Sequence, residues 1–122
     1  KKILKDDNIR ITATTVRVPV KYSHSISTNI EFENPFELED IKKELQDFNG
    51  VILKDDITNN IYPMPIDATG TDEVYVGRIR RDYSLDNGLN IWIVADNVRK
   101  GAATNAVQIA EIVAKNILEE RA

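Results

Sequence analysis

Two neighbouring segments with β-strand patterning constrain this chain most. Residues 73–81 and residues 89–95 both favour extended structure, and Asn87-Gly88 between them is a dipeptide typical of hairpin turns. The second segment is apolar on both faces, with Leu89, Ile91 and Ile93 on one side and Trp92 and Val94 on the other. A strand with two apolar faces is central in its sheet or covered on both sides. We therefore expect the domain to be built around a long antiparallel hairpin.

The remaining patterns extend this hairpin into an α+β domain. Strands are predicted at residues 9–18, 27–33 and 51–54, and amphipathic helices at residues 37–48 and 101–120. Residues 1–4 are expected to be the tail of another helix. Gly77, inside a strand pattern, indicates a bulge or a close backbone approach. The predicted fold is a mixed, largely antiparallel sheet of about five strands with helices packed on one face.

Length and composition exclude several classes of function. At 122 residues the chain is one domain, and its net charge of −4 gives no basic face for nucleic acid. No apolar run reaches the roughly 20 residues of a membrane span, and no signal segment opens the chain, so the cytoplasm is the expected location. The chain has no cysteine and one histidine, which leaves no basis for a disulfide, a thiolate site or a metal centre.

The segment around the single histidine is the first candidate site. Arg17 lies in an apolar, β-branched stretch, where its guanidinium needs an anionic partner such as a carboxylate or phosphate. His24 follows Pro19 and could carry a proton near neutral pH. Each residue also has an ordinary structural interpretation, Arg17 as an edge or interface residue and His24 as a surface residue.

Four motifs, in order, resemble the bacterial aspartate-semialdehyde dehydrogenases. They are Arg17-Val18-Pro19-Val20 with His24-Ser25, Ile61-Tyr62-Pro63-Met64-Pro65, Val76-Gly77-Arg78-Ile79-Arg80-Arg81-Asp82, and the run from Asp96-Asn97 through Arg99-Lys100-Gly101-Ala102 to Glu111. The resemblance covers nearly all of this chain but only about the last third of a family member. It therefore implies a C-terminal catalytic and dimerisation part of a longer enzyme.

The resemblance implies a reaction and a set of site residues. The family makes aspartate semialdehyde from aspartyl phosphate with NADPH, toward lysine (through diaminopimelate), threonine and methionine. His24 would be the acid–base catalyst, Arg17 would bind the substrate carboxylate, and Asn97 would contact the NADP cofactor. The family's cysteine nucleophile and nucleotide-binding domain are absent, so the chain alone is expected to be inactive. Residues 101–120 would pack on that missing domain, and the whole enzyme would be a homodimer or homotetramer.

Two alternatives stay open. One is a stand-alone, non-catalytic dimerisation or small-anion-binding domain that uses Arg17 or the helix start at Gly101. It predicts His24 to be paired or exposed and far from Arg17, whereas catalysis predicts that the two converge around open space. The other is the related acyl-phosphate reductase of arginine biosynthesis, whose signature around the histidine differs. A cluster of Arg78, Arg80 and Arg81 is interpreted as salt bridging on a sheet face or at a subunit interface.

Overall fold

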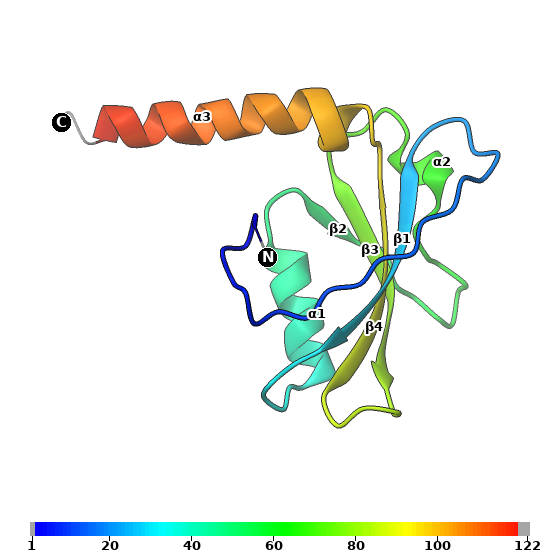
Figure 1. Cartoon of the computed structure of the whole chain (residues 1–122). Helices are drawn as coiled ribbons and strands as arrows, with labels where there is room; N and C mark the ends of the chain where they lie inside the picture. The colour runs from blue at the N-terminus through cyan, green and yellow to red at the C-terminus, as the bar shows by residue number, and fades with distance from the viewer. Residues whose placement is uncertain (1, 120–122) are drawn as a thin grey trace.

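A four-stranded sheet is the centre of the molecule. A computed structural model describes residues 2–119. Its strands are β1 (His24–Glu31), β2 (Val51–Leu53), β3 (Val74–Asp82) and β4 (Gly88–Ala95), in the order β1-β4-β3-β2. β4 pairs antiparallel with both β1 and β3, and β2 pairs parallel with β3 (Figure 1). The mixed, largely antiparallel sheet is confirmed, with four strands in place of about five.

The predicted hairpin is β3 and β4, and β4 is central as its two apolar faces indicated. Its register is interrupted by a bulge between Gly77 and Arg80. A Cβ on Gly77 would lie 2.2 Å from the Lys54 carbonyl oxygen and 2.6 Å from the Pro63 Cδ, so only glycine fits there. The carboxylate of Asp55 accepts hydrogen bonds from the two backbone N–H groups that the bulge frees, at 2.7 and 3.3 Å. Both predictions for Gly77, a bulge and a close backbone approach, are confirmed.

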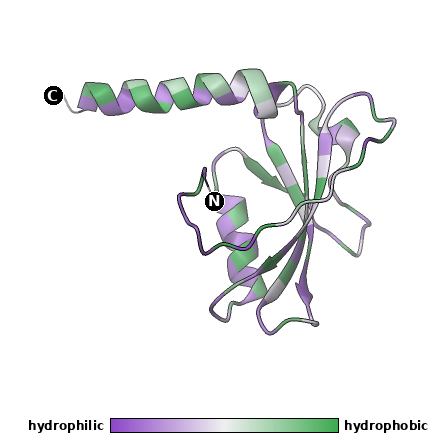
Figure 2. Cartoon of the chain, viewed as in Figure 1, coloured by the Kyte–Doolittle hydropathy of each residue, from purple (hydrophilic) through white to green (hydrophobic). Residues whose placement is uncertain are grey.

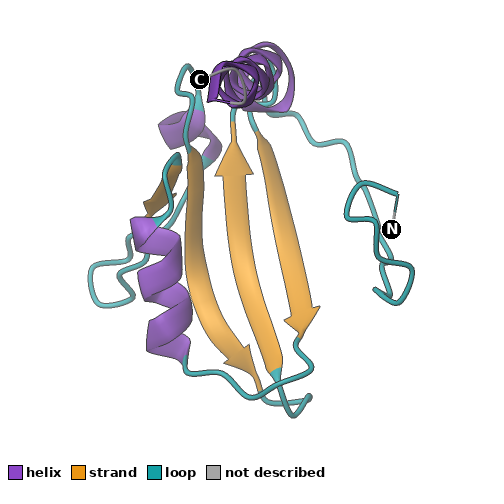
Figure 3. Ribbon diagram, turned by 90° about the vertical axis from the view of Figure 1, so that its left-hand side faces the viewer, coloured by secondary structure: helices purple, strands orange, loops and turns teal. Residues whose placement is uncertain are grey.

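The hydrophobic core lies between the sheet and one helix. Helix α1 (Leu38–Asp47) packs its apolar side, Leu38, Ile41 and Leu45, against the buried strand residues. Figure 3 shows α1 lying along one face of the sheet. These buried residues are Val76, Ile79, Leu89 and Ile91.

The opposite face of the sheet is covered in part by an irregular segment that ends in a short helix. Trp92, which points away from α1, donates its indole N–H to the Pro63 carbonyl at 3.1 Å. Helix α2 (Pro65–Ala68) follows, contacts β4, and buries Ala68 completely. The sequence patterns did not predict this helix, which is only four residues long.

The predicted strand at residues 9–18 is wrong. This segment is irregular and almost wholly exposed. It runs outside β1, the edge strand, and away from the sheet (Figures 1 and 3). Ile, Val and Thr residues favour a strand only when a partner supplies the hydrogen-bond ladder, and no segment described here does so. The predicted helix tail is also wrong where it can be compared, because residues 2–5 form a turn; Lys1 lies outside the described residues.

The C-terminal helix extends away from the sheet. The predicted helix at residues 101–120 begins earlier, with a π-helical turn, η1 (Arg99–Ala103), and continues as α3 (Thr104–Glu119); Glu120 lies outside the described residues. Hydrophobic residues recur along α3 (Figure 2). Several of them are exposed, including Ile109 (54% exposed) and Ile112 (62%). No helix within residues 2–119 has the length and hydropathy needed to cross a membrane.

Candidate active-site half at one end of the sheet

The sheet topology brings two of the three predicted site residues to the same end. His24 is the first residue of β1 and pairs with Ala95, the last residue of β4. Asn97 follows two residues later. Because the strands are antiparallel, the start of β1 and the end of β4 meet at the end of the sheet where α3 begins (Figure 1).

His24 is exposed at this end. Within residues 2–119 its imidazole makes no hydrogen bond or ion pair. Side chains alternate along a strand, so His24 shares a face with Ile26 and with Ile30, which packs on the core. Ile26 is 53% exposed, because α1 does not reach this part of the face. The imidazole is therefore open to contact with a ligand.

Arg17 lies in the irregular segment before β1. It is exposed and has no hydrogen bond or ion pair to any residue in the described part of the chain. The structure does not join it to His24 by any contact. A groove of about 360 Å³ does exist, but it lies on the face that carries Trp92, with Tyr62 and Arg78 also in its lining, and includes neither Arg17 nor His24. The exposure of His24 agrees with one prediction of the alternative in which the chain is a non-catalytic dimerisation or small-anion-binding domain.

Ser23 anchors the irregular segment at the point where β1 begins. It is 7% exposed and is the first buried residue along the described chain. Its φ of 73° lies in the left-handed region that non-glycine residues rarely adopt. Its hydroxyl lies 3.1 Å from the Pro65 carbonyl oxygen and 3.1 Å from the Thr69 hydroxyl. No sequence signal marked Ser23, since its burial depends on contacts with residues more than 40 positions away.

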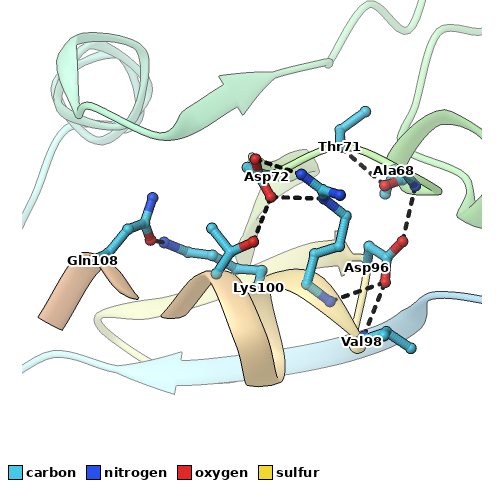
Figure 4. A network of polar contacts seen from close by, with 10 residues as sticks. Ala68, Thr71, Asp72, Asp96, Val98, Lys100 and Gln108 are labelled. Carbon is cyan, nitrogen blue, oxygen red and sulfur yellow. Dashed lines mark hydrogen bonds and ion pairs between the residues drawn. The ribbon is translucent and has the colours of Figure 1, made fainter. Parts of the chain in front are cut away.

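Asp96 anchors the chain at the end of β4, as Ser23 does at the start of β1. It is 4% exposed, and one carboxylate oxygen accepts the backbone N–H of Gly70 at 2.8 Å. The other oxygen accepts the N–H groups of Val98 at 2.9 Å and Arg99 at 3.3 Å, which caps η1 (Figure 4). The hydrogen bond from Gly70 is the main cause that lowers the pKa of Asp96, so the carboxylate is ionised. An Asp directly before a helix is a capping signal, but the helix was predicted to begin at residue 101, so Asp96 was not identified as a cap from the sequence.

A second carboxylate fixes the start of α3. Asp72 binds the Arg99 guanidinium through both oxygens, at 2.7 and 2.8 Å, and accepts the Thr104 hydroxyl at 2.6 Å. These groups, Arg99 first, lower the pKa of Asp72 to about 2. In η1 itself, Lys100 donates to the Gln108 side chain at 2.6 Å (Figure 4).

Asn97 lies between these contacts and has a free side chain. It is half-buried, and its amide makes no hydrogen bond within residues 2–119. An amide offers both donor and acceptor atoms, which suits a carboxamide or another polar ligand group. Among the same residues, no group of three or more His, Asp or Glu side chains could hold a metal ion.

The arginine cluster divides into two parts. Arg81 binds the Phe36 carbonyl, lies over the Phe36 ring and faces Glu37 at 3.8 Å, as the salt-bridge interpretation predicted. Arg78 lies over the Tyr62 ring at 6.0 Å, and Arg80 donates to the Arg78 carbonyl. Neither Arg78 nor Arg80 forms an ion pair within the described residues, so for these two the prediction of salt bridging within the chain is wrong.

Comparison with known proteins identifies close similarity along most of the chain. Residues 1–100 match the family model described as "Semialdehyde dehydrogenase, dimerisation domain". The aspartate-semialdehyde dehydrogenase of Aquifex aeolicus is 54% identical over 94% of this chain and 34% of its own length. That of Legionella pneumophila is 50% identical over 97% of this chain and 34% of its own length. The chain therefore spans about a third of the length of these relatives.

Solved structures show the same similarity. Aspartate semialdehyde dehydrogenase II from Vibrio cholerae matches with a TM-score of 0.76 and 45% identity, over 81% of this chain and 29% of that one. The same Vibrio cholerae enzyme has also been solved in complex with ASA, with the same match. A probable aspartate-semialdehyde dehydrogenase from Pseudomonas aeruginosa matches with a TM-score of 0.72 and 38% identity, over 80% of this chain and 28% of that one.

Proposed function

Because the chain belongs to the semialdehyde dehydrogenase dimerisation domain family, we propose that it serves an NADP-dependent aspartate-semialdehyde dehydrogenase. The whole protein would convert L-aspartyl 4-phosphate to L-aspartate 4-semialdehyde and phosphate, a step toward lysine (through diaminopimelate), threonine and methionine. The observation that supports this most strongly is the identity of about half of all residues with such enzymes over more than nine-tenths of the chain.

The chain would supply two groups to the reacting substrate. His24 would take the proton of a cysteine thiol supplied by the rest of the protein, and would give a proton back to the hemithioacetal oxygen. Its exposed position, with no partner among the described residues, leaves both exchanges open. Arg17 would bind the substrate carboxylate through two parallel N–H donors and so hold the acyl carbon in place.

One of the described residues, Asn97, would contact the cofactor. Asn97 has a free amide at the end of the sheet that also holds His24. The chain contains no glycine-rich loop after a strand, so the phosphates of NADP would be bound by another part of the protein. When bound, NADPH would supply the hydride. Asn97 would orient its reactive end near His24.

A second copy of the protein is the expected partner. The matching family model is a dimerisation domain, and β1 leaves one edge of the sheet unpaired in the described chain. We propose a homodimer or a homotetramer, with the small-molecule substrate as the other partner and the cytoplasm as the location.

An assay of the full-length protein beside the 122-residue chain tests this function. We expect the full-length protein to reduce NADP with aspartate semialdehyde and phosphate, and the chain alone to show no turnover and no NADP binding. A full-length protein without this activity would contradict the proposal.

The exposed, unpaired Arg17 favours a second candidate, a small-anion-binding domain. Titration of the chain with aspartate or phosphate tests it. Saturable binding that is lost in Arg17→Leu, together with no dehydrogenase activity in the full-length protein, would support this candidate over the enzyme.

A further inference from the structure

Each of two proposed site residues is directly preceded by a buried polar residue. Within residues 2–119, Ser23 (7% exposed) and Asp96 (4%) are the polar residues that are buried. Ser23 precedes His24, and Asp96 precedes Asn97. A buried polar group needs hydrogen-bond partners to offset its lost hydration, and both residues have them.

The partners of both residues lie in one turn. The Ser23 hydroxyl is 3.1 Å from the Thr69 hydroxyl, and the backbone N–H of Gly70 donates to Asp96 at 2.8 Å. The turn is itself held by the Pro65 carbonyl, which accepts the Thr69 hydroxyl at 2.7 Å and the Thr69 N–H at 3.1 Å. A polar path therefore runs from the buried Ser23 through the exposed Thr69 and Gly70 to the buried Asp96, and we call it the turn bridge.

The two ends of the turn bridge fix backbone and not only side chains. At one end the left-handed φ of 73° at Ser23 directs the chain into β1 at His24. At the other end the second oxygen of Asp96 holds the N–H groups of Val98 and Arg99, so Asn97 is enclosed between two fixed points. Strained backbone persists where the surroundings determine it, and such residues gather at functional sites.

We infer that the turn bridge positions His24 relative to Asn97, so that Ser23, Thr69 and Asp96 are positioning residues. The inference rests on the roles proposed above for His24 and Asn97. Strand pairing alone sets the backbones of His24 and Ala95 side by side, but both lie at the ends of their strands, where ladders fray most easily. The turn bridge joins the two chain segments just beyond that pair, at Ser23 and Asp96.

The first test uses the 122-residue chain and needs no enzyme activity. Thr69→Val removes the central hydroxyl and keeps the side-chain shape, whereas Thr28→Val makes the same change at a half-buried residue of β1 with no side-chain hydrogen bond among the described residues. NMR reads the imidazole of the single histidine and the side-chain amide of Asn97. We expect Thr69→Val to shift or broaden both signals, and Thr28→Val to leave the Asn97 signal unchanged. An Asn97 signal that moves no further in Thr69→Val than in Thr28→Val would overturn the inference.

Two further variants separate positioning from a general loss of structure. Thr69→Ser keeps the hydroxyl and is expected to restore both signals. Ser23→Gly removes the hydroxyl but suits the left-handed φ, so the chain should keep its melting temperature while the Asn97 signal still moves. Wild-type positions of both signals in Ser23→Gly would show that the Ser23 hydroxyl does not position Asn97, and would overturn the role of that hydroxyl.

The second test measures the full-length dehydrogenase. Thr69→Val is expected to lower kcat by roughly 10- to 100-fold with little change in KM for aspartate semialdehyde, because a misplaced acid–base group reduces the chemical step. Thr69→Ser is expected to restore kcat. An unchanged kcat in Thr69→Val would overturn the inference, whereas a wild-type protein without dehydrogenase activity would overturn the proposed function and leave the NMR result standing.

Discussion

His24 differs from the buried polar residues around it because nothing in the described chain satisfies its imidazole. Such a group contributes little to folding, so we expect its removal to lower the activity and to leave the stability nearly unchanged. In the full-length protein, His24→Asn is expected to lower kcat by about 10²- to 10⁴-fold, the usual contribution of a positioned acid–base group. Steady-state kinetics and a melting curve measure the two effects separately. A variant with full kcat would show that His24 is not the proton carrier.

Arg17 is expected to act on binding. Arg17→Lys keeps the charge but removes the planar fork of donors, so KM for the substrate should rise by at least about 10-fold. Kinetic constants of the full-length variant measure this, with Arg10→Lys as the control, since Arg10 is another exposed arginine of the same segment and is paired with Glu31 at 3.4 Å. Equal KM values for Arg17→Lys and Arg10→Lys would contradict the role of Arg17.

The ionised Asp72 makes the stability of the folded chain depend on pH. Its folded pKa is about 2, below the value of about 3.9 for an unfolded aspartate. A lowered folded pKa stabilises the folded state above the unfolded pKa, and this stabilisation is lost as the pH falls from about 4 to about 2. We expect carboxyl NMR of the chain to place the Asp72 midpoint near 2, and Asp72→Asn to flatten this part of the stability curve. A midpoint near 4 would mean that Asp72 is not paired with Arg99.

Among the elements, β3 has the most specific sequence requirement, because its bulge needs a glycine at position 77. A Cβ at Gly77 would overlap backbone atoms of Lys54, which cannot move aside as a flexible side chain can. Gly77→Ala is therefore expected to lower the free energy of unfolding by about 2 kcal/mol or more. Urea denaturation of the chain measures it. Gly101→Ala is the control, because its Cβ would meet only the Asn97 Cβ at an ordinary 3.8 Å. Equal midpoints for the two variants would contradict the close approach.

The elements that could be predicted from the sequence are those with a strong local period. The β3–β4 hairpin and α1 have alternating or helical apolar patterns, and the glycine inside β3 correctly marked a bulge. The segment at residues 9–18 has the same β-branched composition but no ladder partner, so composition alone predicted a strand that does not form. Ser23 and the turn at Thr69 could not be found in this way, because their hydrogen bonds join segments distant in sequence. Of the proposed site residues, His24 and Arg17 stand out by type, while the contacts of Ser23 that fix the backbone next to His24 depend on tertiary structure.

The whole molecule consists of a packed sheet domain and a helix that extends from it. α3 is anchored at its start by Asp72 and by η1, and its apolar side is exposed along its length. We propose that another domain of the protein covers this side. The described chain is therefore expected to have two levels of stability, one for the sheet with α1 and a lower one for α3.

Hydrogen exchange of the intact chain tests this division. A helix of 16 residues without tertiary packing is marginal in water, so the amides beyond the first turn of α3 should exchange close to the rate of an unfolded peptide. Amides of β3 and β4 should be protected up to the global free energy of unfolding. Helix α1 is the control: it is shorter, with 10 residues, but packs on the sheet, so it should be far better protected than α3. Protection of α3 equal to that of α1 would show that its apolar side is covered in solution, and a concentration dependence of that protection would identify the cover as a second copy of the chain.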